Sequence, residues 1–199
     1  CPGGIKPDVI IPFSDLKHFR QGMSSGTPSP YHSVDVQMFC GGTSGNTAHG
    51  LSVLGVKSMI AAKIGNDYPG RSIRAAMEEA GVDVEHVLFD DVHPTASILI
   101  IVDEDGDRYL VPWPKLGGAN DFLLPGDLPN SLLPKVGWVH FCGDILKIDP
   151  TGETLCDFAR RCHLAGITVS LDLNLRIESS GWNDAFAEKI RRVMEVSTV

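Results

Sequence analysis

The chain has 199 residues, of which 43% are hydrophobic and 21% are charged, so it can form one domain with an ordinary buried core. Its formal net charge is −8 and it has no basic cluster, which argues against a nucleic-acid partner because binding a phosphate backbone needs clustered lysine and arginine. Its apolar runs have the length of strands, so we expect neither a membrane span nor a signal peptide. Five cysteines without regular spacing are typical of reduced thiols in a cytoplasmic protein.

Helix-like and strand-like patterns alternate along most of the chain. In chain order we expect strands at 8–11 and 34–38, a helix at 46–54, a strand at 57–64, a helix at 68–80, a hairpin of strands at 97–102 and 108–111, a strand at 138–142, a helix at 151–165, a strand at 167–173 and a helix at 182–194. Two segments rich in proline and glycine, 24–30 and 112–134, are expected to be irregular. The alternation predicts a mostly parallel sheet covered by helices on both faces, whereas the early strands and the hairpin are expected to form a small accessory sheet.

A glycine cluster, Gly41, Gly42 and Gly45 followed by Asn46, stands between an expected strand and an expected helix. Its spacing fits neither a Walker A loop nor the G-x-G-x-x-G dinucleotide fingerprint, which disfavours a Rossmann-type oxidoreductase. A strand-to-helix corner presents free backbone N–H groups and the positive end of a helix, which suit an anionic or hydroxyl-rich ligand, and an asparagine amide can both donate and accept. The alternative is a purely structural corner in which Asn46 helps to cap the helix.

Two further residues are candidates for contact with such a ligand. Asp8 lies at a strand end, where α/β folds collect ligands, and its carboxylate can accept two hydroxyl hydrogen bonds. The alternative is an ordinary turn aspartate beside a proline. Arg108 on the expected hairpin could reach over a bound sugar if the hairpin acts as a lid, and the alternative is an edge strand kept soluble by its charge.

Asp172, Asn174 and Arg176 alternate along the expected strand at 167–173 and just beyond it, so we expect all three on one face or its rim. The arginine could clamp phosphate oxygens through two hydrogen bonds, and the aspartate could help to hold hydrated Mg²⁺. The alternative is an ordinary aspartate–arginine pair on the surface.

The glycine turn resembles the first signature of the ribokinase-like (PfkB) family of carbohydrate and nucleoside kinases. The matching positions are Gly41, Gly42, Asn46, Ala48, Gly55 and Gly65, and the departure is Ser44, where the family prefers Gly, Ala or Pro. Four other stretches are similar to family motifs: 4–8 (GIKPD), 63–70 (KIGNDYPG), 118–120 (GAN) with 124–128 (LPGDL), and 172–176 (DLNLR) with Trp182. The resemblance therefore runs essentially from one end of the chain to the other.

This resemblance implies a three-layer α/β/α sandwich with a mostly parallel sheet and a β-sheet lid. Residues 1–199 would be a partial kinase domain, with lid strands within 8–40 and 95–112. The implied activity is ATP-dependent phosphorylation of a sugar-like hydroxyl, with ATP and Mg²⁺ as cofactors and a sugar or nucleoside as substrate. The implied substrate-side residues are Asp8, Gly41, Gly42, Asn46 and Arg108, and the residues implied on the phosphate or magnesium side are Asp172, Asn174 and Arg176.

Two motifs of the family do not occur in these residues: the G-A-G-D motif that carries the general base, and the N-x-x-E element associated with magnesium. The chain also starts without methionine, and by the resemblance its first residues fall inside the family's first strand. We therefore expect the N-terminal two-thirds of a kinase, which has no catalytic residue of its own and no turnover alone. A non-catalytic sugar-binding module of the same fold is the alternative.

The expected hairpin also carries apolar residues at 98, 100 and 102, all on one face of a strand. An exposed face of this kind could pair with a second copy of the chain, so a homodimer through the lid sheet is a further expectation.

Overall fold

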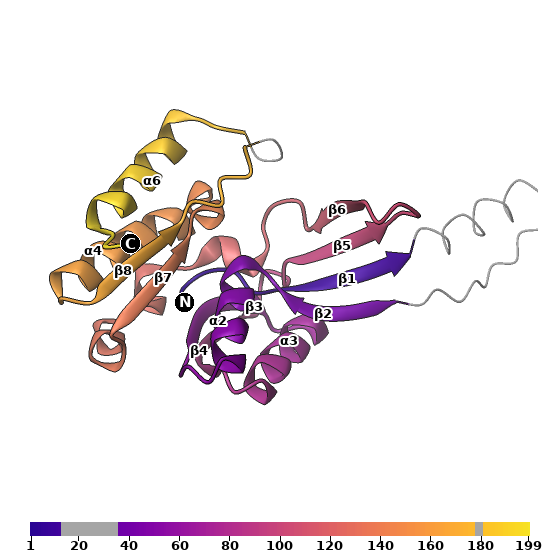
Figure 1. The fold of residues 1–199 in the computed structure, drawn as a ribbon, viewed down its shortest axis with the longest axis horizontal. Coiled ribbons are helices and arrows are strands. Elements are labelled where there is room, and N and C mark those ends of the chain that lie inside the picture. Colours follow the sequence, from indigo (N-terminus) through magenta and orange to yellow (C-terminus); the bar gives the residue numbers. More distant parts are fainter. Residues whose placement is uncertain (13–35, 178–180) are drawn as a thin grey trace, which may run out of the picture.

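The computed structural model describes residues 1–12, 36–177 and 181–199 and has a mixed α/β fold (Figure 1). Its elements in chain order are β1 (Lys6–Pro12), β2 (Gln37–Gly41), α2 (Thr43–Val53), β3 (Met59–Gly65), α3 (Tyr68–Glu79), β4 (Asp83–Asp90), β5 (Ser97–Val102), β6 (Arg108–Trp113), the short 3-10 helices η1 (Ala119–Phe122), η2 (Pro125–Asp127) and η3 (Asn130–Lys135), β7 (Trp138–Cys142), the 3-10 helix η4 (Gly143–Lys147), α4 (Thr151–Leu164), β8 (Thr168–Asp172) and α6 (Asp184–Val196). No helix in the described part of the chain combines the length and the apolar character that crossing a bilayer requires.

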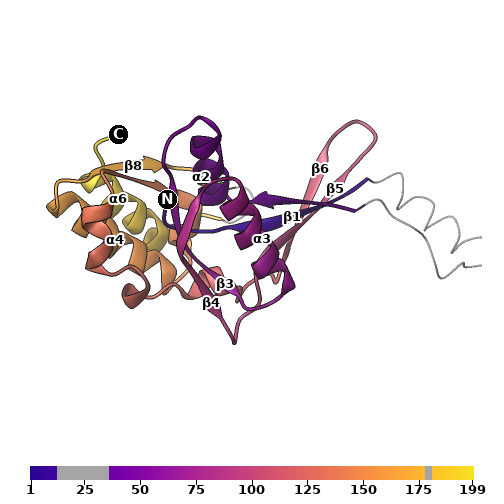
Figure 2. The same cartoon turned by 90° about the horizontal axis from the view of Figure 1, so that it is seen from below.

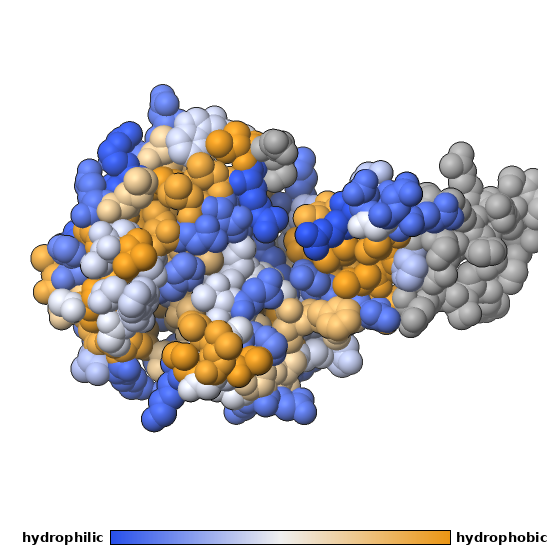
Figure 3. All heavy atoms as spheres, in the orientation of Figure 1, coloured by the Kyte–Doolittle hydropathy of each residue, from blue (hydrophilic) through white to orange (hydrophobic). Residues whose placement is uncertain are grey.

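The early strands and the hairpin form one four-stranded sheet in the order β2-β1-β5-β6. The strand β1 pairs antiparallel with β2 and parallel with β5, and β5 pairs antiparallel with β6. This sheet extends away from the helices in both views, and we call it the projecting sheet (Figures 1 and 2). In Figure 3 apolar surface lies over it, with hydrophilic surface along its upper edge. The hairpin predicted at 97–102 and 108–111 is thereby confirmed.

The helical body is built on two parallel strand pairs, β3 with β4 and β7 with β8. The first residues of the chain run beside β3, where the Gly3 N–H donates to the Ala61 carbonyl at 2.9 Å, and the chain then continues directly into β1. Both faces of β3 are covered, because alternate side chains of a strand point to opposite sides. Ile60, Ala62 and Ile64 pack in the cluster that includes residues of α2 and α3, whereas Ala61 packs in the cluster formed by α4, α6, β7 and β8.

The clearest predicted helix, α3, shows why its sequence forms a helix. Asp67 caps its N-terminus by accepting a hydrogen bond from the Gly70 N–H at 2.9 Å, and a proline occupies the first turn, where its missing N–H costs nothing. Ile73 and Met77, four residues apart, are its buried side chains against β3 and β4.

Several expected boundaries were wrong. The helix expected at 46–54 begins at Thr43, and the strand expected at 167–173 ends at Asp172. The segment 112–134, expected to be irregular with a short helix at most, contains the end of β6, the 3-10 helices η1 and η2 and most of η3. The strand β4 was missed altogether, because exposed Asp83 and Glu85 interrupt its apolar pattern. Residues 13–35, which include the expected loop at 24–30 and the start of the strand expected at 34–38, lie outside the described residues.

Candidate functional site

The glycine corner lies where the projecting sheet meets the body, between β2 and α2. Gly42 is the N-cap residue of α2 and has a φ of +83°, a conformation that favours glycine. A Cβ at this position would lie 2.7 Å from the Gly4 carbonyl oxygen and 3.0 Å from the Ile5 Cα, so close packing against the residues before β1 also requires glycine. Gly42 is therefore fully accounted for by local structure, whatever the corner binds.

Asn46 does not cap the helix, contrary to one of the two readings of the sequence. It lies within the first turn of α2, where its N–H donates to the Gly42 carbonyl at 2.8 Å, and α2 has no side-chain cap. Its side chain is exposed. The amide is therefore available to a ligand at the start of the helix.

Asp8 and Gly41 lie directly against each other, which joins the two places that the sequence singled out. A Cβ built on Gly41 would lie 2.1 Å from Oδ2 and 2.4 Å from Cγ of Asp8, so the carboxylate occupies the space that any side chain at position 41 would need. The register explains the contact, since Lys6 pairs with Gly41 and Asp8 pairs with Phe39, which puts all four residues on one face of the projecting sheet. We call this the Asp8 face.

The Asp8 carboxylate is half-buried and has cations around it. Burial raises its pKa above the ordinary value, while the positive charges of Lys6, Arg108 and Arg176 oppose that rise. These cations come from β1, from β6 and from the segment after β8 respectively. Arg108 is exposed and, through its pairing with Val102 and the pairing of Val102 with Pro12, lies on the Asp8 face as well.

The three residues at the end of β8 do not share a strand face as expected. The strand stops at Asp172, and Asn174 and Arg176 have left-handed φ angles of 34° and 46°. Local hydrogen bonds link them instead: the Asn174 N–H donates to Asp172 Oδ1 at 3.1 Å, and Arg176 Nε donates to Asn174 Oδ1 at 3.2 Å. The three residues therefore lie at the rim beyond the strand rather than on a common strand face, because the chain turns before the second of them.

The end of β7 contributes residues that reading the sequence missed. Asp144 accepts a hydrogen bond on Oδ1 from the Thr43 hydroxyl at 3.1 Å, which ties η4 to the glycine corner. Lys147, at the end of η4, is half-buried. The signal that could have found them is their place directly after a parallel strand, because ligands of α/β folds collect at that end of the strands.

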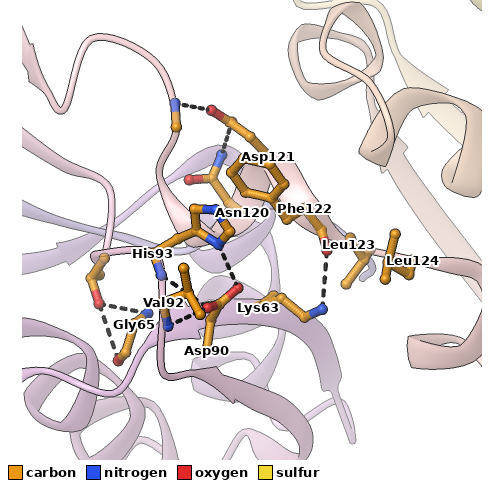
Figure 4. A network of polar contacts seen from close by, with 12 residues as sticks. Lys63, Gly65, Asp90, Val92, His93, Asn120, Asp121, Phe122, Leu123 and Leu124 are labelled. Atoms are coloured by element: carbon orange, nitrogen blue, oxygen red, sulfur yellow. Dashed lines mark hydrogen bonds and ion pairs between the residues drawn. The ribbon is translucent and has the colours of Figure 1, made fainter.

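The segment η1, which carries the 118–120 motif, is held by a polar network below it (Figure 4). Lys63 on β3 donates to the Phe122 carbonyl at 3.0 Å and forms an ion pair with Asp127 at 2.6 Å. His93 stacks on the Phe122 ring, and its Nδ1 lies 3.0 Å from Asp90 Oδ2. These contacts attach η1 to the body.

Asn120 and Asp121 complete this network on its upper side (Figure 4). Asp121 accepts from the Gly117 N–H at 2.9 Å and from the Asn120 side-chain amide at 2.9 Å. The Asn120 Oδ1 atom is buried and, among the described residues, has no hydrogen-bond partner. Buried polar atoms are normally satisfied, so this oxygen is an acceptor without an assigned partner.

The described residues include no group of three or more His, Cys, Asp or Glu side chains that could hold a metal ion. Asp172, expected on the magnesium side, is exposed and contributes one carboxylate. Divalent magnesium in proteins relies on one or two carboxylates together with substrate phosphates and water, so these residues alone do not form a metal site.

A model of the pfkB family carbohydrate kinases matches residues 12–199 of the chain. Among curated relatives, the chain is 31% identical over 144 residues to a fructokinase of Salmonella typhimurium, a match that covers 72% of this chain and 45% of the relative. It is 30% identical over 162 residues to the aminoimidazole riboside kinase of Salmonella typhimurium, covering 80% of this chain and 49% of that enzyme. The chain thus spans about half the length of the curated relatives it matches.

Solved structures agree on the fold. The fructokinase of Xylella fastidiosa with bound ATP superposes with a TM-score of 0.80 at 19% identity, covering 99% of this chain and 58% of that one. A double mutant of the fructokinase of Vibrio cholerae, in a form with fructose, ADP and potassium ion bound, superposes with a TM-score of 0.73 at 24% identity, covering 98% of this chain and 56% of that one.

Proposed function

Because this chain belongs to the pfkB family of carbohydrate kinases, we propose that the full-length protein transfers a phosphoryl group from ATP to a hydroxyl of a sugar-like acceptor. The observation that carries the proposal is the contact between the Asp8 carboxylate and the bare Cα of Gly41. A half-buried carboxylate beside an open helix start can accept hydroxyl hydrogen bonds while backbone N–H groups face the same ligand.

On the acceptor side, each residue has one proposed task. Asp8 accepts hydrogen bonds from two hydroxyls, and Gly41 leaves the space that this carboxylate fills. Gly42 allows the sharp turn into α2, and Asn46 offers an exposed amide at the helix start. Arg108 lies on the Asp8 face, so a sugar held by Asp8 would lie beneath it if the projecting sheet acts as a lid.

On the phosphate side, we assign Asp172, Asn174 and Arg176 to the neighbourhood of the transferred group. The charge of Arg176 reaches Asp8, which supports a place for it between the acceptor and the nucleotide. A guanidinium in this position would neutralise charge that develops on the phosphoryl oxygens. The general base is expected outside these residues, so we expect no turnover from residues 1–199 alone, and no step is assigned to magnesium.

The same proposal includes the fold of the complete protein. The covered faces of β3 and the two parallel strand pairs support a three-layer α/β/α sandwich that is completed by the remainder of the protein. In that arrangement the projecting sheet is the lid.

The homodimer through the lid sheet stays a prediction, and the face on which we expected it also carries the proposed acceptor site. Ile100 is only 8% exposed, and Ile98, Ile100 and Val102 pair with residues of the Asp8 face, so a partner there would cover the site. Phe39 and Leu110 on the Asp8 face are exposed too, but the opposite face of the projecting sheet carries four exposed apolar side chains that a second copy would cover. These side chains are Met38, Tyr109, Val111 and Trp113.

The test is an assay of ADP formation by the full-length protein with a panel of sugars and nucleosides. The Asp8→Asn variant should lose about 10- to 150-fold in kcat/KM, because a hydrogen bond to a charged group contributes about 1.5–3 kcal/mol. Asp105→Asn, at the exposed hairpin turn, is the matched control and should keep full activity. Equal activity of Asp8→Asn and the wild type would refute the assignment.

If the protein is instead a sugar-binding module without catalysis, we expect different results in thermal unfolding and in the ADP assay. Sugars would raise the thermal unfolding temperature of the full-length protein in an Asp8-dependent way, since a ligand that binds only the folded state stabilises it. No ADP would form with any acceptor.

A further inference from the structure

Two lysines near the proposed acceptor site have no partner among the residues that the structure describes. Lys6 precedes Asp8 by two residues on β1, so both side chains are on the Asp8 face. Lys147 ends η4, directly after β7. Both are half-buried, and neither forms a hydrogen bond or an ion pair within the described part of the chain.

The segment η4 packs against the residues before β1, because a Cβ built on Gly4 would lie 3.3 Å from Ile145 Cδ1 and 3.6 Å from Lys6 Cε. Lys147 follows Ile145 by two residues, so the two lysines are close enough for their charges to interact. Burial lowers the pKa of Lys147, and Lys6 and Arg176 lower it further, while Asp144 and Asp121 oppose the shift. Lys6, Lys147 and Arg176, from three separate elements, therefore lie near one another, and the charges of Lys6 and Arg176 also act on Asp8. Like charges brought together out of water cost free energy, and proteins keep such arrangements mainly at functional sites.

The carboxylates around the lysines do not neutralise them by direct contact. Asp121 is occupied by the Gly117 N–H and the Asn120 amide, and Asp144 accepts from the Thr43 hydroxyl. The Asp8 carboxylate lies against Gly41. Within residues 1–12, 36–177 and 181–199, the N–H donors of both ammonium groups are therefore unused and suit a ligand.

The chemistry of these donors differs from that of Asp8. A carboxylate accepts from sugar hydroxyls, whereas an ammonium group only donates and favours an oxyanion with several acceptor oxygens. We propose that Lys6 and Lys147 form an anion subsite, and that the acceptor carries a carboxylate or a phosphate ester besides the hydroxyl that is phosphorylated. This inference rests on the proposed function, because it concerns the acceptor side of the same site.

The transferred phosphate of ATP is the other anion that could reach these lysines. The position of Lys6 favours the acceptor, because Lys6 lies on the same strand and the same face as the residue that binds the acceptor hydroxyls. Lysines that bind the acceptor should affect the kcat/KM for anionic acceptors, whereas lysines that bind the nucleotide should affect the KM for ATP, so one kinetic experiment distinguishes the two assignments.

The experiment compares neutral sugars with their aldonic acids and their phosphate monoesters as acceptors of the full-length protein. The wild type should prefer an anionic acceptor by at least about 10-fold in kcat/KM, and Lys147→Met and Lys6→Met should each lower that preference by about 10-fold or more. Lys147→Arg keeps the charge and should retain most of the preference. Lys115→Met, at an exposed lysine outside the site, is the matched control and should leave the ratio unchanged.

Several results would overturn the subsite. The subsite would be refuted if the wild type prefers neutral acceptors, or if the lysine variants keep the wild-type ratio of kcat/KM for anionic over neutral acceptors. If the lysine variants raise the KM for ATP and leave the preference for anionic acceptors unchanged, the lysines bind the nucleotide, and the acceptor subsite is refuted as well. Thermal unfolding of each variant confirms folding, and loss of a half-buried unpaired charge should not destabilise the protein.

Failure of the proposed function gives a separate result. If no acceptor is phosphorylated, calorimetric titration of the same acids and phosphate esters into the wild type and Lys147→Met still tests the subsite. Binding that depends on Lys147 without turnover supports the subsite and refutes the kinase, whereas equal binding to both proteins, or no binding to either, refutes the subsite.

Discussion

Replacing Gly41 with alanine tests the contact on which the proposed function depends. The new Cβ would lie 2.1 Å from Asp8 Oδ2 and 2.7 Å from Oδ1, distances that no carbon and oxygen adopt without bonding. The backbone at Gly41 is outside the left-handed region, so alanine is tolerated by the main chain itself. The Asp8 carboxylate must therefore move, and the fold should remain.

The expected loss follows from what the carboxylate does. A displaced carboxylate forfeits at least one charge-assisted hydrogen bond to the acceptor, about 1.5–3 kcal/mol, which is roughly 10- to 150-fold in kcat/KM. The free energy of unfolding should change by only about 1 kcal/mol, because a short side chain can rotate away from the new methyl group.

Steady-state kinetics and urea unfolding of the full-length protein measure both quantities. Gly50→Ala is the matched control, because a Cβ there meets nothing within 4 Å, and alanine should stabilise α2 by up to about 1 kcal/mol without affecting activity. An active Gly41→Ala enzyme, within twofold of the wild type, would show that Asp8 does not hold the acceptor against this corner.

Three further predictions concern stability. Gly42→Ala should lower the free energy of unfolding by about 2 kcal/mol or more in urea, because an alanine with a φ of 83° and a ψ of 143° costs about 1–3 kcal/mol before its contact with the Gly4 carbonyl is counted; an unchanged midpoint would contradict this. Burial alone would raise the pKa of Asp67, but hydrogen bonds from Thr95 and Gly70 hold this pKa below its ordinary value. The Asp67 carboxylate therefore contributes its full stabilisation above about pH 3.9, the pKa in the unfolded chain, and this contribution is lost as the pH falls through the lower pKa of the folded state. In Asp67→Asn the free energy of unfolding should therefore fall less steeply with decreasing pH below about pH 4 than in the wild type. Equally steep falls in the two proteins would contradict this prediction. Asp149→Ala should destabilise by about 2 kcal/mol in thermal unfolding, because Lys189, 5% exposed, loses its 2.6 Å ion pair, whereas Asp149→Ala combined with Lys189→Met should recover most of that loss; no recovery would contradict the prediction.

Elements with a strong local signal were predictable from the sequence. The Asp-Gly turn identified the hairpin β5–β6, and the N-cap, proline and apolar spacing identified α3. The strand β4 was not predictable in the same way, because charged residues alternate with its buried valines and nothing local indicates that it pairs beside β3.

The residues of the candidate site likewise fall into those that a sequence motif indicated and those that only the packing of the fold brings together. The proximity of Asp8 to the glycine corner was expected from motif resemblance and the structure places them in contact, although their roles in binding stay predictions. Lys6 and Lys147 are separated by most of the chain, and their approach depends on how β1 and η4 pack, so no pattern in the sequence indicated it. The common face expected for Asn174 and Arg176 failed because left-handed residues are hard to recognise without a glycine.

The route of the chain from the body into the projecting sheet limits how a substrate could enter. Residues 1–3 are hydrogen-bonded beside β3 and lead straight into β1, so bending along this one of the connections between body and sheet would have to occur at Gly3 and Gly4. That junction is tightly filled: a Cβ at Gly3 would lie 2.3 Å from the Ser44 hydroxyl oxygen and one at Gly4 would lie 3.3 Å from the Ile145 Cδ1. The root of the sheet, with Asp8 close by, is thus packed against the body, so any lid movement of the projecting sheet would have to involve its outer end, which carries Arg108.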